Sequence, residues 1–119
     1  MTNYKLLVVD DEKNKGLLYE QELEDEGYEV DIANSGIEAL EKFKMNSYDL
    51  VVLDIGMPEM DGLETLGRLV VIDNSIPVII YTAYPSYKEN FMSWAADAYV
   101  VKSMDIGELK DKIKEILGE

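Results

Sequence analysis

Five polar residues stand at or directly after apolar, strand-like runs of the chain. Asp10 and Asp11 follow "KLLVV", and Asp54 follows "LVVL". Thr82 closes "VIIYT", and Lys102 closes "AYVVK". In a parallel sheet the carboxyl ends of the strands meet along one edge, and ligands bind there. If these runs belong to one such sheet, three carboxylates, a hydroxyl and an ammonium converge on a single site.

The three carboxylates of this group suit a divalent metal ion. Carboxylates a few ångströms apart repel each other, and their pKa values rise unless a cation lies between them. Mg²⁺ takes oxygen ligands and keeps several of its own waters beside them. Gly56, shortly after Asp54, lets a backbone carbonyl approach such an ion without side-chain obstruction.

The group as a whole suits phosphoryl transfer. A carboxylate at the centre of the site can attack phosphorus, while a nearby lysine and hydroxyl bind the transferred oxygens. The metal ion and Lys102 would then stabilise the negative charge that develops during transfer. These residue types therefore indicate a metal-assisted reaction at phosphorus.

The composition narrows the function classes. The 119 residues correspond to one domain, expected to span 1–119. The chain has no cysteine or histidine, which excludes disulfides, thiol chemistry and histidine-based catalysis or metal binding. A net charge of −14 disfavours direct binding to nucleic acid or membranes and favours basic partners or a divalent cation. With no transmembrane-length run and no signal-peptide pattern, we expect a cytoplasmic protein.

Strand-like and helix-like segments alternate along the chain. The expected strands cover residues 4–10, 28–33, 50–54, 78–82 and 98–102. The expected helices cover about 12–26, 35–44, 61–73, 86–95 and 106–117. Most of the strands are continuous apolar runs, which is typical of a parallel sheet with helices on both faces. The sequence therefore predicts an α/β fold with five parallel strands and five helices.

Local signals mark the helix ends and faces. Gly27 is expected to end the first helix, and Ser35 with Glu38 has the spacing of a capping box. Asp61, before Gly62, is interpreted as the N-cap of the third helix. The residues expected to face the core are Leu17, Leu18 and Leu23 in the first helix, Ile37, Leu40 and Phe43 in the second, and Ile106, Leu109, Ile113, Ile116 and Leu117 in the last.

Four stretches, taken together, resemble the receiver domain of bacterial two-component response regulators. They are "VVDDE" at 8–12, "VVLDIGMPEMDG" at 51–62, "IIYTA" at 79–83 and "AYVVKS" at 98–103. The resemblance covers the whole chain. It is to receivers of the chemotaxis type, which are called CheY-like. It implies a flavodoxin-like, doubly wound sheet with the strand order 2-1-3-4-5.

The resemblance also implies roles for the site residues. Asp54 would be the phospho-acceptor. Asp10 and Asp11 would bind Mg²⁺ directly or through water, together with Asp54 and the carbonyl of Gly56. Thr82 would hydrogen-bond the phosphoryl group, and Lys102 would pair with it. Tyr99 would be the switch aromatic, the residue that turns inward on phosphorylation.

The partners implied by the resemblance are proteins. A sensor histidine kinase or phosphotransfer protein would supply the phosphoryl group, and a downstream protein target or a homodimer would use the face of the fourth helix, fifth strand and fifth helix. Tyr84, Tyr87, Trp94 and Tyr99 make this region aromatic, as recognition surfaces often are. The chain would then act as a switch and not as a turnover enzyme.

One residue departs from the family pattern. The family usually has a proline after the lysine of the fifth strand, often with a cis peptide bond, and Ser103 stands there in this chain. A cis bond before a residue other than proline costs about 2.5–4 kcal/mol. A trans bond and a different loop are therefore expected after Lys102.

Three other functions fit the sequence less well than the switch. An aspartyl-phosphate phosphatase of the haloacid-dehalogenase type needs a second acid two residues after its nucleophile, where this chain has Gly56. A pseudo-receiver that binds its partner without phosphorylation is disfavoured by the full acidic set. A nucleotide or flavin binder of the same fold needs a phosphate-cradling loop, but "DDEKNKG" at 10–16 is acidic.

Structural interpretations of single features also stay open. Asp10 and Asp11 could cap the first helix and favour its dipole. The side formed by Tyr87, Phe91 and Trp94 is more typical of core than of an interface. The acidic residues of the first helix are interpreted as a solvated face, with docking of a basic partner as the alternative; they are Glu20, Glu22, Glu24, Asp25 and Glu26.

Overall fold

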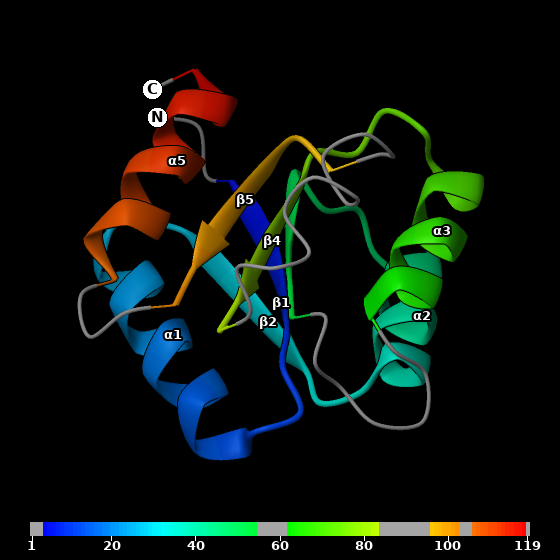
Figure 1. Ribbon diagram of the computed structural model, residues 1–119, viewed down its shortest axis with the longest axis horizontal. Helices are drawn as coiled ribbons and strands as arrows, with labels where there is room; N and C mark the ends of the chain where they lie inside the picture. The colour runs from blue at the N-terminus through cyan, green and yellow to red at the C-terminus, as the bar shows by residue number, and fades with distance from the viewer. Residues whose placement is uncertain (1–3, 55–61, 84–95, 103–105, 119) are drawn as a thin grey trace.

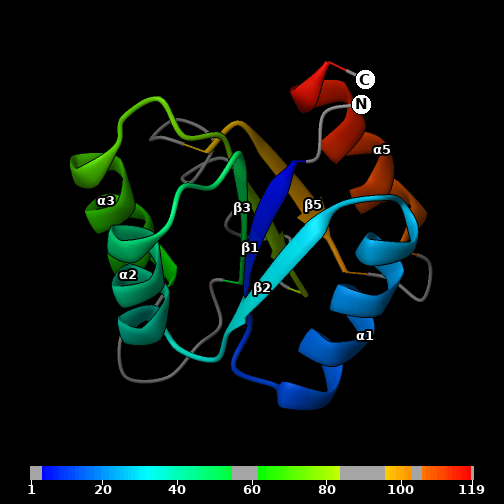
Figure 2. The ribbon, with the colours of Figure 1, turned by 180° about the vertical axis from the view of Figure 1, so that it is seen from behind.

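Five parallel strands form one sheet in the order β2-β1-β3-β4-β5 (Figure 1). The computed structural model describes residues 4–54, 62–83, 96–102 and 106–118. The strands are β1 (Lys5–Val9), β2 (Glu29–Ala33), β3 (Leu50–Leu53), β4 (Val78–Thr82) and β5 (Ala98–Val101). Figure 2 shows β2 at the edge of the sheet beside β1. The predicted fold class and strand order are confirmed.

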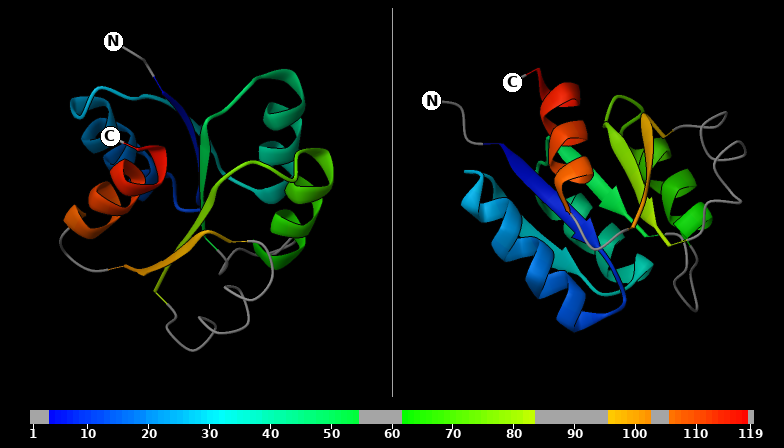
Figure 3. Two further views of the ribbon diagram at one scale, coloured as in Figure 1. Left: turned by 90° about the horizontal axis from the view of Figure 1, so that it is seen from above. Right: turned by 60° about the vertical axis from the view of Figure 1, so that its left-hand side comes forward.

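Helices cover both faces of the sheet. They are α1 (Lys13–Asp25), α2 (Gly36–Met45), α3 (Gly62–Ile72) and α5 (Gly107–Leu117). α1 and α5 lie on one face, and α2 and α3 lie on the other (Figure 3). The structure describes four helices where the sequence predicted five, because the helix expected at 86–95 lies outside the described residues. None of the helices within the described ranges has the length and apolar character needed to cross a membrane.

Alternate strand residues pack into two separate core layers. In β4, Val78 and Ile80 belong to the layer beneath α2 and α3, and Ile79 and Tyr81 belong to the layer beneath α1 and α5. Every residue of β4 is buried. Burial on both faces explains why the strand is a continuous apolar run without alternation.

The predicted helix ends are confirmed at two positions. The Ser35 hydroxyl accepts a hydrogen bond from the Glu38 amide at 3.0 Å, and the Glu38 carboxylate accepts one from the Asn34 amide at 2.8 Å. Ser35 therefore satisfies an amide in the first turn of α2, while Glu38 accepts from the residue before the N-cap, Asn34, in place of the N-cap amide of a standard capping box. Gly27 follows α1 with a φ of 97°, which is a left-handed conformation that favours glycine.

Part of the predicted helix facing is wrong. Leu17, Leu18 and Ile37 are exposed, whereas Tyr19 and Leu23 form the buried side of α1. Tyr19 and Leu23 are one turn apart and stack on the same helix face. The prediction counted only aliphatic residues in this helix, so it missed the tyrosine that sets the direction of the buried side.

The other helix faces follow the prediction more closely. Leu40 and Phe43 are buried in α2, where Gly36 and Ala39 take the remaining core positions. The residues predicted for the last helix all pack on the core beneath α1 and α5. Leu109 and Ile113 are fully buried, and Ile106, Ile116 and Leu117 are partly buried.

Candidate functional site

Backbone hydrogen bonds extend the sheet by one residue at three strand ends. The amide of Asp10 donates to the Ala33 carbonyl at 3.0 Å, and the amide of Asp54 donates to the Val9 carbonyl at 3.0 Å. The amide of Lys102 donates to the Thr82 carbonyl at 2.7 Å. The side chains of Asp10, Asp54 and Lys102 thus start from hydrogen-bonded backbone positions at the same edge of the sheet.

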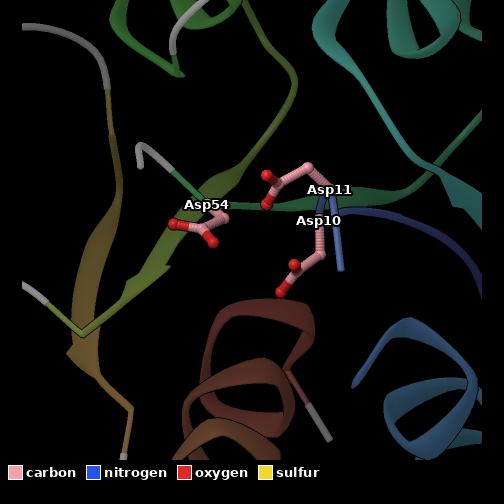
Figure 4. A group of neighbouring side chains, drawn as sticks. All are labelled: Asp10, Asp11 and Asp54. Carbon is pink, nitrogen blue, oxygen red and sulfur yellow. The ribbon is translucent and has the colours of Figure 1, made fainter. Parts of the chain in front are cut away.

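Three carboxylates meet at this edge. Figure 4 shows Asp10 and Asp11 after β1 beside Asp54, which follows β3. One carboxylate oxygen from each residue lies within 4.8 Å of the others. Asp10 is 1% exposed and Asp54 8%, while Asp11 is more open to solvent. The donor set is all oxygen and partly accessible, which fits Mg²⁺.

The charge on Asp11 is disfavoured in the folded protein. Burial raises the pKa of the Asp11 carboxyl, and the neighbouring charges of Asp10 and Asp54 raise this pKa further. Carboxylates in such a cluster are relieved by a bound cation. The electrostatics of the cluster therefore favour a divalent ion in contact with Asp11.

Lys102 brings its ammonium between two of the carboxylates. Its Nζ lies 2.7 Å from Oδ2 of Asp10 and 3.1 Å from Oδ2 of Asp54. The lysine side chain is only 11% exposed. Burial alone would lower the pKa of Lys102, but the hydrogen bond to Asp10 and the charges of Asp54 and Asp10 together raise this pKa. Lys102 is thus a permanent cation at the sheet edge.

Two tyrosine rings flank the same ammonium. Lys102 Nζ lies 5.7 Å from the ring centroid of Tyr19 and 5.8 Å from that of Tyr81. Burial raises the pKa of Tyr81 to about 12, so its ring stays neutral at physiological pH. Neither tyrosine was predicted to belong to the site. Tyr81 could have been found as the strand residue before Thr82, but Tyr19 carries no comparable signal.

Thr82 and Tyr99 lie on one face of the sheet. Strand alternation places Thr82 on the same side as Val78 and Ile80, and its side chain is fully buried. Tyr99 pairs with Ile80 in the β4–β5 register and belongs to the same core layer. Tyr99 is 8% exposed, so it is buried in this layer.

The capping interpretation of the two aspartates is only partly right. The N-cap of α1 is Glu12, and its side chain makes no capping hydrogen bond. Asp10 Oδ1 instead accepts a hydrogen bond from the Glu12 amide at 2.9 Å. One oxygen of Asp10 therefore supports the turn into α1, while the other faces Lys102.

Several residues singled out in the sequence lie outside the described part of the structure. They are Gly56, Asp61, Tyr84, Tyr87, Phe91, Trp94 and Ser103. The Gly56 carbonyl, the Asp61 cap, the aromatic side at 86–95 and the peptide bond after Lys102 stay predictions.

The sequence also matches a protein-family model. Residues 6–114 match the response regulator receiver domain. This chain belongs to the response regulator receiver domain family. Members of the family are signalling switches, and the site described above lies where the receiver motifs end their strands.

Curated relatives carry the same domain in chains of different length. The chain is 40% identical to the response regulator ArlR of Staphylococcus saprophyticus over 115 residues, which is 95% of this chain and 52% of ArlR. It therefore spans about half of that relative. It is 38% identical to sporulation initiation phosphotransferase F of Bacillus subtilis over 119 residues, covering 98% of this chain and 96% of that protein.

A solved receiver has nearly the same fold. The response regulator TrrA of Thermotoga maritima, in a crystal complex with Mg²⁺ and BeF, is 49% identical with a TM-score of 0.90, and the match covers 95% of this chain and 98% of TrrA. TrrA in complex with the histidine kinase ThkA gives a TM-score of 0.88 at 49% identity, covering 96% and 98% of the two chains. TrrA was thus crystallised with Mg²⁺, the cofactor that the aspartate cluster of this receiver fits.

Proposed function

We propose that this receiver domain takes a phosphoryl group from a phosphohistidine donor onto Asp54 in a Mg²⁺-dependent reaction. The observation that carries the proposal is the convergence of Asp54, two further carboxylates and the buried ammonium of Lys102 at one sheet edge. An acceptor carboxylate, metal ligands and a fixed positive charge are the parts that phosphoryl transfer requires.

The proposed step exchanges one bond to phosphorus for another. A carboxylate oxygen of Asp54 attacks the phosphorus of the phosphohistidine as the N–P bond breaks. The electron pair of that bond stays on the donor imidazole, and the new O–P bond makes Asp54 an acyl phosphate. Lys102, already 3.1 Å from the Asp54 carboxylate, stabilises the charge on the transferred oxygens.

Asp10, Asp11 and Asp54 would hold the Mg²⁺ ion. When bound, the ion supplies positive charge that neutralises the phosphoryl oxygens and orients them. Asp10 also stabilises the turn into α1, because its Oδ1 accepts a hydrogen bond from the Glu12 amide. The Gly56 carbonyl remains a further proposed ligand.

The donor is proposed to be a sensor histidine kinase or a phosphotransfer protein. The crystal complex of TrrA with the histidine kinase ThkA supports the first class. The net charge of −14 favours a donor with a basic contact surface. The likeness to sporulation initiation phosphotransferase F is consistent with a place in a phosphotransfer chain.

The output is proposed to follow from Thr82 and Tyr99. A phosphoryl group on Asp54 would draw the Thr82 hydroxyl toward it, and Tyr99 shares the buried layer beside Thr82. The change would bias a two-state face made of the residues at 86–95, β5 and α5. A downstream protein target or a second copy of the chain would recognise that face.

The protein is proposed to act as a switch without multiple turnover. A phosphatase would instead release phosphate from generic monoesters, which gives a simple assay to separate the two functions.

The single-domain organisation of residues 1–119 and the cytoplasmic location also stay predictions.

Intact-mass analysis tests the proposal. Wild type is incubated with acetyl phosphate, with and without Mg²⁺, beside Asp54→Asn. Asp49→Asn is the matched control, because Asp49 precedes the same strand at its opposite end. We expect a single Mg²⁺-dependent phosphoryl adduct on wild type and Asp49→Asn and none on Asp54→Asn. Undiminished labelling of Asp54→Asn would reject the assignment.

A further inference from the structure

The ammonium of Lys102 lies over a pair of buried aromatic rings. Tyr19 comes from α1 and Tyr81 from β4, and both rings are buried, at 7% and 4% exposure. Their ring centroids are 5.4 Å apart with the planes at 70°, an edge-to-face arrangement. Lys102 Nζ lies within 6 Å of both centroids.

The physical effect of this arrangement is to hold a flexible side chain in one place. Lysine carries its charge on a four-carbon stem with many rotamers, and fixing it costs conformational entropy. The face of an aromatic ring attracts a cation, and the attraction is stronger where water is excluded. Two buried rings that meet edge to face can hold the ammonium from two directions.

The rings differ from the carboxylates in one important way. Asp10 and Asp54 are both partners of Lys102 and candidate ligands of Mg²⁺. The oxygens of these residues must therefore be shared between two cations. Tyr19 and Tyr81 are not in the metal cluster, so their contacts with Lys102 do not compete with a metal ion.

We propose that Tyr19 and Tyr81 are positioning residues that seat the Lys102 ammonium for phosphoryl transfer. This inference rests on the proposed function, because it assigns the pair a part in the same reaction. The rings touch Lys102 and act through it. The rate of phosphorylation at Asp54 should therefore depend on Tyr19 and Tyr81, which lie outside the acidic cluster.

A spectroscopic measurement tests, without any reaction, whether the rings of Tyr19 and Tyr81 hold the Lys102 ammonium; we call this contact the seat of Lys102. Protein labelled with ¹³C and ¹⁵N at lysine is compared with Lys102→Met to assign the Lys102 side-chain signals. Wild type should show an upfield ring-current shift at the Lys102 end of the side chain. The shift should persist in Tyr81→Phe, which keeps the ring, and shrink in Tyr81→Leu and Tyr19→Leu. Tyr28→Leu is the matched control, because Tyr28 is a buried tyrosine of the same core layer but precedes β2 at the other end of the sheet.

A rate measurement tests the function of the seat. With saturating Mg²⁺ and acetyl phosphate, Tyr81→Leu and Tyr19→Leu should be phosphorylated about tenfold more slowly than wild type, the scale of one desolvated cation–π contact. Tyr81→Phe should recover most of the rate, and Tyr28→Leu should leave it unchanged. The Mg²⁺ affinity of all these variants, measured by calorimetry, should match that of wild type.

The outcomes separate the two proposals. If wild type is phosphorylated and both leucine variants react at the wild-type rate, the positioning role is overturned and the proposed function stands. If wild type is not phosphorylated, the proposed function fails, while the ring-current shift still decides whether the seat exists. Should Tyr81→Leu not fold, Tyr19→Leu, Tyr81→Phe and the wild-type shift carry the test, and a wild-type Lys102 without an upfield shift would reject the inference.

Discussion

Lys102 Nζ lies 2.7 Å from Oδ2 of Asp10, a pair that joins the residue after β5 to the residue after β1. Asp10 is almost fully buried, so this ion pair offsets the cost of removing its carboxylate from water. The ammonium also reaches Asp54 at 3.1 Å. Within the described residues, Lys102 is the cation paired with both buried carboxylates.

Removing this charge should destabilise the metal-free protein. Lys102→Met keeps much of the side-chain volume but leaves Asp10 and Asp54 without their buried cation. The free energy of unfolding should fall by about 3 kcal/mol, the lower end of the range for one partner lost from a buried pair. Mg²⁺ should restore part of the loss, because an ion that binds the folded state stabilises it. Urea unfolding with and without Mg²⁺ measures both effects.

An ion pair that is more open to solvent provides the matched control. Lys110 on α5 lies 2.8 Å from the Glu22 carboxylate on α1, a distance close to that of the buried pair. Because solvent screens this contact, Lys110→Met should cost far less than Lys102→Met, and Mg²⁺ should not compensate. Equal losses in the two variants would show that burial does not set the strength of the Lys102 pair.

The charge of Asp11 should cost stability when no metal is bound. Because the pKa of Asp11 is raised, the folded state holds its proton more tightly than the unfolded state does. The cost is present above the folded-state pKa and disappears as the pH falls through it. Asp11→Asn should therefore stabilise the metal-free protein at neutral pH, and the gain should shrink on acidification.

The same Asp11→Asn variant should bind Mg²⁺ more weakly, because it replaces a charged oxygen ligand. Urea unfolding across a pH series measures the stability, and calorimetry measures the Mg²⁺ affinity. A variant with unchanged Mg²⁺ affinity would remove Asp11 from the metal site.

Thr82→Val should separate phosphorylation from its consequence. Valine keeps the shape of threonine but lacks the hydroxyl that would bind the phosphoryl oxygens. Asp54 should still be modified, while the change at Tyr99 on adding Mg²⁺ and beryllofluoride should be smaller than in wild type. NMR signals of the Tyr99 ring report the change, and Thr82→Ser should restore it. A full Tyr99 response in Thr82→Val would show that the hydroxyl is not the link.

Ser35→Ala should weaken the fold without touching the site. The Ser35 hydroxyl accepts the Glu38 amide at the start of α2, and loss of such a cap costs about 1 kcal/mol. Ser35→Asp keeps an acceptor and should retain most of the stability. Chemical denaturation checks the cost, and an unchanged rate of phosphorylation is expected in both variants. An unaltered unfolding midpoint for Ser35→Ala would show that the capping bond contributes nothing.

Much of the fold and the site could be predicted because parallel strands place local signals at one edge. β4 has the predicted bounds, Val78 to Thr82, since a strand buried on both faces is a continuous apolar run. Asp10, Asp54 and Lys102 meet as expected because each follows the end of a strand in the same sheet. Their convergence depends only on strand direction and needs no knowledge of side-chain packing.

Side-chain packing between distant elements could not be predicted in the same way. The buried side of α1 depends on how Tyr19 fits between this helix and β4, and local spacing placed Leu17 and Leu18 there instead. The seat of Lys102 joins α1, β4 and the end of β5 in space. These three residues are far apart in the sequence, so no local pattern predicts that Tyr19 and Tyr81 lie beside Lys102.

Chemical trapping can show whether Asp54 becomes an acyl phosphate. Borohydride reduces an aspartyl phosphate to homoserine, and peptide mass spectrometry then locates the changed residue. After reaction with a phosphorylated histidine kinase domain and Mg²⁺, we predict homoserine at position 54 and at no other aspartate. Homoserine at a different position, or its absence from protein that has gained a phosphoryl group, would show that Asp54 is not the phospho-acceptor.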